Sequence, residues 1–222
     1  MGPEEVSDSY DAGGYCEQPE AKHLNKALLG VDHDKWLRTY PRQDLCRNGD
    51  IEKRARAIID ANQTAYADWG FKDPRTVLTY TFWAELLPAH KVIAVYRDPM
   101  SLWQRTRRGA GPKWHQDPLR AVQMLSRWLD HNVRLRDIVA NDPERCLLLR
   151  YERLMDTSRE LARLSAFLGR EVADRRDSGL WRGKHTETPL LRLARPIAER
   201  RNGHRVDRLL QDLDRLREQQ LH

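Results

Sequence analysis

Cysteine is scarce in this sequence, and the features of exported or membrane-spanning proteins are missing. The three cysteines, Cys16, Cys46 and Cys146, are odd in number and widely spaced, which favours reduced thiols over a disulfide framework. No apolar run approaches the roughly 18 residues of a membrane-spanning helix. The first segment is acidic and polar, whereas a signal peptide is basic and then apolar. These absences predict a soluble, cytoplasmic protein with no membrane span.

The sequence also lacks a metal-binding motif and a nucleotide-binding loop of the Gly-Lys type. Its 8 histidines and 3 cysteines show no ligand spacing, so we expect no metal. The only Gly-Lys pair, Gly183 and Lys184, follows no predicted strand, and its preceding glycine, Gly179, is one residue too close. A kinase or nucleotide hydrolase is therefore disfavoured, because a magnesium-carboxylate motif is missing as well.

The composition is that of a folded chain with a basic surface. Hydrophobic residues make up 40% and charged residues 32% of the 222 residues, which predicts a single domain over residues 1–222. The formal net charge of +6 is carried mostly by arginine, which binds phosphate and sulfate through two parallel hydrogen bonds. An anionic ligand and a merely solubilising surface both fit this charge.

The first half of the chain is predicted to be largely helical. Apolar residues recur at helical spacing after Pro19 and again from Ile51, while the first 20 residues show glycine and proline without periodicity. We expect an irregular first segment, a helix from about Pro19, a helix over Ile51–Trp69, a very short strand at Phe71–Asp73, and a helix over Thr76–Leu87 ended by Pro88.

The second half alternates strands and helices, which implies an α/β fold with a parallel sheet. The run Val92–Tyr96 is continuously apolar, as expected for a strand buried on both faces, and Cys146–Arg150 is a second strand candidate. Arg97, Asp98 and Pro99 follow the first strand at its carboxyl end, where open α/β sheets bind ligands. The other expected elements are the end of a helix and a mobile loop over 104–118, helices over 119–139 and 156–168, a loop over 174–189, and a helix over 206–220.

Four segments stand in an order that resembles a known family. They read GGYCEQPEAKHLNKALL, GFKDPRTVLTYTFWAELLP, KVIAVYRDP and LLLRYERLMDTSRELARLSAFLG. Together they resemble the sulfotransferases that use 3′-phosphoadenosine 5′-phosphosulfate (PAPS), particularly the bacterial and tyrosylprotein-like branch. The resemblance covers about residues 1–170 and leaves 171–222 as an Arg-rich loop and terminal helix. It implies a three-layer P-loop-like domain with a small parallel sheet flanked by helices, which transfers a sulfuryl group from PAPS to an acceptor hydroxyl.

The resemblance implies a cofactor-binding role for residues after the first strand. Arg97 resembles the family arginine that holds the 3′-phosphate, a task suited to a guanidinium. The alternative is a surface arginine paired with Asp98. The family places a serine eight residues after that arginine, but Arg105 stands there in this sequence. Arg105 could serve the anion by charge, or Ser101 or Thr106 could take the role of the serine.

The resemblance also implies two catalytic residues. Lys72 resembles a family lysine near the transferred group, where a cation stabilises developing negative charge. Glu17 resembles the carboxylate that deprotonates the acceptor hydroxyl, and His23 is a weaker candidate for that role. A solvated lysine and a plain loop glutamate are the alternatives. Arg75 is expected to support the Lys72 segment.

Two further groups are expected to be mainly structural. The sequence RYE at Arg150, Tyr151 and Glu152 resembles a strand-end signature of the family that closes the site. Tryptophan could stack on an adenine, although an indole is more often part of a core or an interface. The candidates for either role are Trp103, Trp114, Trp128 and Trp181.

One family motif is missing from the sequence. Sulfotransferases carry a strand and a glycine-rich loop of the type PRSGTS or PKSGTT, whose backbone N–H groups hold the 5′-phosphosulfate. No such motif occurs, and MGPEE resembles text that follows the loop, so we expect Met1 to be an internal methionine of an N-terminally truncated chain. Little or no turnover is then expected from these 222 residues alone.

Several alternatives stay open at this stage. A non-catalytic sulfotransferase-like protein that binds a nucleotide or another anion fits the same residues. A nucleic-acid-binding protein is suggested by the basic runs at 104–113 and 192–208, although no binding motif accompanies them and we expect no nucleic-acid partner. The acceptor could be a small molecule, a carbohydrate, a lipid or a peptide hydroxyl. The oligomeric state is equally open.

Overall fold

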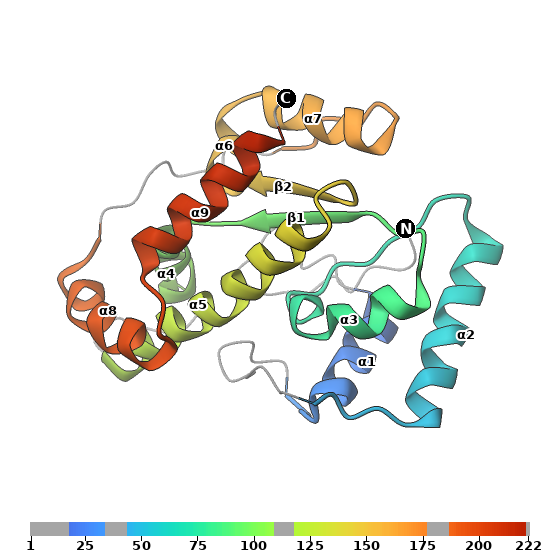
Figure 1. Cartoon of the computed structure of the whole chain (residues 1–222), viewed down its shortest axis with the longest axis horizontal. Coiled ribbons are helices and arrows are strands. Elements are labelled where there is room, and N and C mark those ends of the chain that lie inside the picture. Colours follow the sequence, from blue (N-terminus) through green and yellow to red (C-terminus); the bar gives the residue numbers. More distant parts are fainter. Residues whose placement is uncertain (1–17, 34–43, 109–117, 177–186, 221–222) are drawn as a thin grey trace. The chain divides into compact units, whose positions relative to one another are not determined.

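The computed structural model describes residues 18–33, 44–108, 118–176 and 187–220. The chain divides into two compact units, Met1–Ala89 and His90–His222, and each is described by itself. The described part of the first unit contains helices and no strand, and the second unit contains a small parallel sheet with helices around it (Figure 1). The expected α/β fold with a small parallel sheet flanked by helices is therefore confirmed.

The first unit contains helices α1 (Pro19–Leu29), α2 (Gly49–Ala65) and α3 (Thr76–Leu86), which confirms the three predicted helices. α2 ends earlier than predicted, because Tyr66 adopts an extended conformation. The predicted strand at Phe71–Asp73 is wrong. The Asp73 carboxylate accepts the backbone N–H of Arg75 at 3.0 Å and begins the turn into α3, so this segment does not join a ladder.

Buried apolar side chains of all three helices form the core of the first unit. Its members are Ala21, Leu24, Leu28, Ile51, Ala55, Ile59, Phe82 and Trp83. Asn25 of α1 lies buried beside this core, and its amide oxygen accepts from Thr79 at 2.6 Å and from Trp83 at 2.8 Å. Its amide nitrogen donates to Asp73 at 3.0 Å. One asparagine thus ties α1 to α3 and to the turn before α3.

The second unit is built around strands β1 (Val92–Tyr96) and β2 (Cys146–Arg150). They pair in parallel, with Val92 opposite Cys146 and Tyr96 opposite Arg150. Helices α4 (Pro99–Arg108) and α5 (Pro118–Asn141) connect them, as a parallel pair requires. Both predicted strands and their parallel pairing are confirmed.

The predicted burial of β1 on both faces is wrong. Ala94 and Tyr96 are buried, whereas Ile93 and Val95 are 45% and 47% exposed. Successive side chains of a strand point to opposite faces, so a strand covered on one side alternates in this way. A continuous apolar run in the sequence is therefore not sufficient to show that both faces of the strand are buried.

The C-terminal part adds helices α6 (Tyr151–Asp156), α7 (Arg159–Leu168), α8 (Pro189–Asn202) and α9 (Val206–Gln219). The predictions of α7 and α9 are confirmed, and Gly169 ends α7 in a left-handed conformation with a φ of 70°. α6 and α8 were not predicted. α8 packs against α5 through one face that includes Leu191, Ala194 and Ala198. Of the expected loop over 174–189, residues 177–186 lie outside the described structure.

The residue after α9 covers one edge of β2. The side-chain oxygen of Gln220 accepts the backbone N–H of Leu148 at 2.9 Å, and its side-chain nitrogen donates to the carbonyl of Cys146 at 2.7 Å. These are the bonds that a neighbouring strand would make. The C-terminal helix is thereby attached to the edge of the sheet.

Candidate functional site

The carboxyl ends of the two strands place Arg97 beside Tyr151. Tyr96 lies opposite Arg150 in the ladder, so the next residue of each strand emerges at the same edge of the sheet. The guanidinium carbon of Arg97 lies 4.2 Å from the centre of the Tyr151 ring, a cation–π contact. One face of the Arg97 guanidinium is therefore held against an aromatic ring.

The turn from β1 into α4 is fixed by Asp98 and Pro99. Asp98 accepts the backbone N–H of Met100 at 2.7 Å, and Pro99 is the first residue of α4, where its fixed φ suits a helix start. Burial raises the pKa of Asp98, and the bond from Met100 opposes this shift. Trp128 of α5 donates its indole N–H to the carbonyl of Arg97 at 2.8 Å. Hydrogen bonds from Met100 and Trp128 thus fix the backbone at the end of β1.

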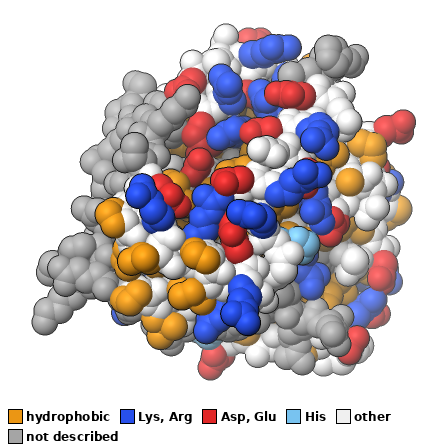
Figure 2. Space-filling model, turned by 60° about the vertical axis from the view of Figure 1, so that its left-hand side comes forward, with side chains coloured by type: hydrophobic (Ala, Val, Ile, Leu, Met, Phe, Trp, Pro, Cys, Tyr) orange, Lys and Arg blue, Asp and Glu red, His pale blue; other side chains and the backbone are white. Residues whose placement is uncertain are grey.

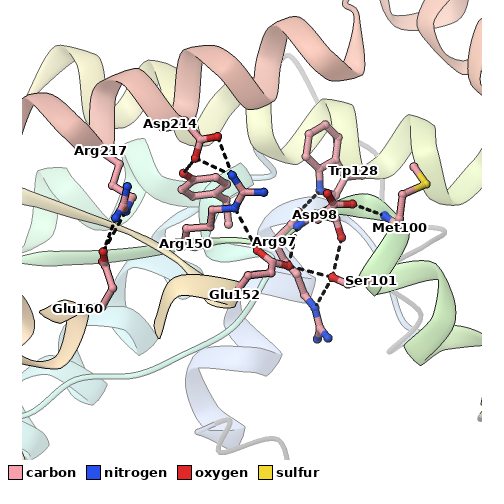
Figure 3. Close-up of polar contacts among 11 residues, drawn as sticks. Arg97, Asp98, Met100, Ser101, Trp128, Arg150, Glu152, Glu160, Asp214 and Arg217 are labelled. Carbon is pink, nitrogen blue, oxygen red and sulfur yellow. Dashed lines mark hydrogen bonds and ion pairs between the residues drawn. The ribbon is translucent and has the colours of Figure 1, made fainter. Parts of the chain in front are cut away.

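Ser101 holds the Arg97 side chain from the first turn of α4 (Figure 3). The Nε–H of Arg97 donates to the Ser101 hydroxyl oxygen at 2.9 Å. The hydroxyl has one proton, and its possible acceptors are the Asp98 carbonyl at 2.9 Å and the Glu152 carboxylate at 3.0 Å. The Ser101 side chain is buried and engaged on all sides by groups of the protein.

Glu152 is the buried carboxylate of this cluster. One of its oxygens accepts from Ser101 and from the backbone N–H of Asp98 at 3.1 Å. Its other oxygen accepts from the Nε–H of Arg150 at 3.3 Å. A buried carboxylate is tolerated when it is paired and hydrogen-bonded in this way. Glu152 therefore joins the ends of β1, β2 and α4.

The two terminal nitrogens of Arg97 are not used by the cluster. Among the described residues they have no hydrogen-bond partner, and Figure 3 shows them pointing away from the cluster. Burial lowers the pKa of Arg97, and Tyr151, Glu152 and Asp98 oppose this shift. A guanidinium always carries its charge in proteins. The terminal nitrogens of Arg97 therefore present a positive charge and several hydrogen-bond donors to an anion.

The predicted cofactor-binding residues fall into two groups. Arg97 and Ser101 are brought together, as described above. Arg105 and Thr106 belong to α4, but their side chains lie outside the described structure. The assignment of all four to a cofactor stays a prediction.

The predicted catalytic residues belong to the first part of the chain. Glu17 lies outside the described residues, and Lys72 is exposed in the first unit. The neighbouring Arg75 is buried and forms a 2.9 Å ion pair with Asp73, a contact that supports the segment. His23 is exposed on α1. The catalytic roles of Lys72 and Glu17 stay predictions.

The tryptophans of the second unit are part of its core where they are described. Trp103 and Trp128 are both almost fully buried, which leaves little ring surface for an adenine. Trp114 and Trp181 lie outside the described residues.

Sequence reasoning missed the contribution of α9 to this cluster. Asp214 accepts from the hydroxyl of Tyr96, and both of its oxygens accept from the NH1 group of Arg150, at 3.0 and 2.7 Å. Burial and the bond to Asp214 raise the pKa of Tyr96, so its hydroxyl stays protonated. Nothing in the sequence singles out Asp214 among the acidic residues of α9, and its partners are 64 and 118 positions away.

The basic run at 192–208 does not form an uninterrupted positive surface. Arg192, Arg205 and Arg208 are strongly exposed, but each lies within 4.0 Å of a carboxylate, those of Glu187, Glu199 and Asp212. Figure 2 shows basic and acidic side chains interspersed on one face of the molecule. These arginines therefore do not form the continuous basic stripe that neutralises phosphates. In the other basic run, 104–113, the side chains lie outside the described structure, and the expectation of no nucleic-acid partner stays a prediction.

The described residues contain neither a membrane-spanning helix nor a cluster of metal ligands. None of the helices there combines the length and the apolar character that crossing a membrane requires. No group of three or more histidine, cysteine, aspartate or glutamate side chains in that part of the chain is placed to hold a metal ion.

Comparison with known proteins gives one match. The model of a family described as Sulfotransferase family matches residues 18–174, which include Arg97, Ser101 and Glu152 and end before α8 and α9. No curated protein and no solved structure matches the chain.

Proposed function

Because the chain belongs to the sulfotransferase family, we propose that Arg97 binds the 3′-phosphate of PAPS in a reaction that transfers a sulfuryl group to an acceptor hydroxyl. The family implies sulfuryl transfer in general. The choice of PAPS as the donor and of Arg97 as its contact is our proposal.

The observation that carries the proposal is that contacts with Ser101 and Tyr151 fix the orientation of the Arg97 side chain. The Nε–H of Arg97 donates to Ser101, and one face of the guanidinium lies against the Tyr151 ring. These two contacts restrict rotation of the guanidinium. Its terminal nitrogens have no partner among the described residues, and they form the edge that binds two oxygens of a phosphate in parallel. Ser101 then acts by holding Arg97, because its own hydroxyl is already engaged by Arg97, Asp98 and Glu152.

The chemical step takes place at the 5′-phosphosulfate of the donor and needs groups other than Arg97. In the reaction the acceptor oxygen forms a bond to sulfur while the bond from sulfur to the bridging oxygen breaks, and 3′-phosphoadenosine 5′-phosphate leaves. We propose that Glu17 takes the proton of the acceptor hydroxyl and that Lys72 stabilises the charge on the bridging oxygen. Both assignments rest on the resemblance of the sequence motifs.

We expect weak turnover by the 222 residues alone. No segment of the PRSGTS or PKSGTT type is present among them. The backbone N–H groups of such a loop would supply several charge-assisted bonds, each worth about 1.5–3 kcal/mol. A non-catalytic protein that binds the nucleotide is the second candidate, and the free edge of Arg97 supports both. Release of labelled sulfate from PAPS to acceptors at ordinary enzyme rates would exclude the non-catalytic alternative.

Calorimetry with two nucleotides tests the proposed binding. Adenosine 3′,5′-bisphosphate carries the 3′-phosphate, and adenosine 5′-monophosphate lacks it. We expect the bisphosphate to bind the chain at least about tenfold more tightly, and we expect Arg97→Ala to remove this difference, since a charge-assisted pair contributes on this scale. Arg136→Ala is the control, because Arg136 is a partly exposed arginine of α5 that pairs with its neighbour Asp137. Equal affinity for both nucleotides, or an unchanged preference in Arg97→Ala, would contradict the proposal.

A further inference from the structure

A continuous path of polar contacts joins α9 to Arg97. Asp214 accepts two bonds from Arg150, which donates from its Nε–H to Glu152 at 3.3 Å. Glu152 is within 3.0 Å of Ser101, whose oxygen accepts from Arg97 at 2.9 Å. All of these residues belong to the second unit, and dashed lines in Figure 3 join them from Asp214 to Arg97.

The charges alternate in sign from Asp214 through Arg150 to Glu152, and the neutral Ser101 hydroxyl joins Glu152 to the Arg97 cation. Asp214 holds the NH1 group of Arg150, which leaves the Nε–H of the same guanidinium directed at Glu152. Burial lowers the pKa of Arg150, but Asp214 and Glu152 outweigh this effect and the pKa is raised. Arg150 is therefore a fixed cation between two carboxylates.

Loss of Asp214 would free Arg150 to move. The Arg150 side chain is partly exposed, whereas that of Glu152 is buried. Without Asp214 the guanidinium can turn to solvent or take both oxygens of Glu152. Either movement changes the orientation of the carboxylate that contacts Ser101, and with it the bond that holds Arg97.

We propose that Asp214 is a positioning residue of the anion site, which sets the orientation of Arg97 through Arg150, Glu152 and Ser101. Asp214 lies beyond the residues that match the family model, so the C-terminal helix of this chain contributes to the site from outside the matched region. The consequence for a nucleotide rests on the proposed function, whereas the coupling to Arg97 does not need a ligand.

The same helix carries a matched control. Arg217 of α9 donates to Glu160 of α7 at 2.6 and 3.1 Å, and both side chains are buried. This pair ties α9 to α7, as Asp214 ties α9 to the end of β2. Glu160 also accepts from Arg163 at 2.7 Å, and no hydrogen bond within the described structure leads from this pair to Arg97. A variant at Arg217 therefore disturbs the anchoring of α9 without touching the path.

The first measurement uses the full chain without ligand. The Nε–H resonance of Arg97 is assigned by its loss in Arg97→Lys, and its exchange with water is followed in Asp214→Ala, Asp214→Asn and Arg217→Gln. We expect Asp214→Ala to speed the exchange about fivefold, as for other coupled polar networks, and Asp214→Asn to give a smaller increase because its amide oxygen still accepts. Arg217→Gln should leave the exchange unchanged. If Asp214→Ala fails to fold, Asp214→Asn, which preserves shape, carries the comparison.

The second measurement is binding of adenosine 3′,5′-bisphosphate by the same variants. We expect Asp214→Ala to weaken binding about fivefold and Arg217→Gln to leave it unchanged. No effect of either Asp214 variant on Arg97 exchange, or an equal effect of Arg217→Gln, would overturn the inference. If the unaltered chain does not bind the bisphosphate, the proposed function fails, and the exchange measurement alone decides whether Asp214 positions Arg97.

Discussion

Two buried serines of the second unit differ in what their hydroxyl groups contact. Ser101 meets Arg97, Glu152 and the Asp98 carbonyl, whereas the Ser126 hydroxyl has no hydrogen-bond partner within the described structure. We expect Ser101→Ala to lower the free energy of unfolding by about 1–3 kcal/mol, because it leaves buried polar groups unpaired. Ser126→Ala should change it little or raise it. Urea titration of the two variants measures both effects.

Comparing the free energies of unfolding of these two variants shows whether Ser101 stabilises the chain by hydrogen bonding or only by packing. Both substitutions remove one buried oxygen atom and leave the same alanine. An equal loss of stability in the two variants would contradict the assignment of Ser101 as the centre of a bonded cluster. The comparison needs no ligand, so it tests the construction of the site independently of its function.

Tyr96 links stability to alkaline pH. Burial and the bond to Asp214 raise the pKa of its phenol, so the folded chain keeps this proton above pH 10 while the unfolded chain loses it. Stability therefore falls as the pH rises above about 10, by at most about 1.4 kcal/mol per pH unit from this group. We expect Tyr96→Phe to show a shallower decline, measured by urea titration from about pH 9 to about pH 11.5.

A second group acts in the same pH range and must be separated from Tyr96. Burial raises the pKa of the Cys146 thiol to about 11, which also makes stability fall as the pH rises from about 9. The difference between the unaltered chain and Tyr96→Phe isolates the tyrosine, because Cys146 is present in both. Tyr66→Phe serves as the control at an exposed position. Parallel curves for Tyr96→Phe and the unaltered chain would contradict the prediction.

At the scale of the element, two glycines lie at helix ends: Gly169 follows the last residue of α7, and Gly49 is the first residue of α2. Gly169 ends α7 with a φ of 70°, and a Cβ placed there would meet no atom within 4 Å. Gly169→Ala should therefore cost about 1–2 kcal/mol from backbone strain alone. Gly49 opens α2 without such a φ and in equally open space, so Gly49→Ala should stabilise by about 0.4–1 kcal/mol. Thermal unfolding of the two variants shows whether the melting temperature moves in opposite directions.

Local signals account for the elements that could be predicted from the sequence. The apolar run of β1, the proline at the start of α1 and Gly169 after α7 each act within a few residues, and each prediction held. α8 also has local signals, since Thr188 caps it and Pro189 begins it. It went unpredicted because the arginines between its buried residues hide the apolar stripe.

Tertiary contacts account for what could not be predicted. The exposure of Ile93 and Val95 depends on which face of β1 other elements cover, and the sequence of a strand does not contain this information. The same holds for the site. Arg97 and the RYE segment with Glu152 could be placed from their positions at strand ends, but the bond from Glu152 to Ser101 spans 51 positions and Asp214 reaches Arg150 across 64.

At the scale of the whole molecule, the chain holds two separate cores. The first unit buries Leu24, Leu28 and Phe82 among its three helices. The second buries residues of α5, β2 and α9, with Leu129, Leu148 and Leu213 fully enclosed. The match to the family model begins in one unit and ends in the other. The matched residues therefore include parts of both cores.

Separate cores predict separate responses to a cavity. Phe82→Ala should destabilise the first unit by about 3–5 kcal/mol and Leu129→Ala the second by about 2–5 kcal/mol, because both side chains are fully buried. Hydrogen exchange followed by mass spectrometry resolves the two units by their peptides. We expect Phe82→Ala to speed exchange in α1, α2 and α3 only, and Leu129→Ala to speed it in α5, α8 and α9 only. Faster exchange throughout the chain in either variant would mean that the two cores unfold as one cooperative block. The Arg97 cluster would then depend on the helices of the first unit for its stability, although it makes its described contacts within the second.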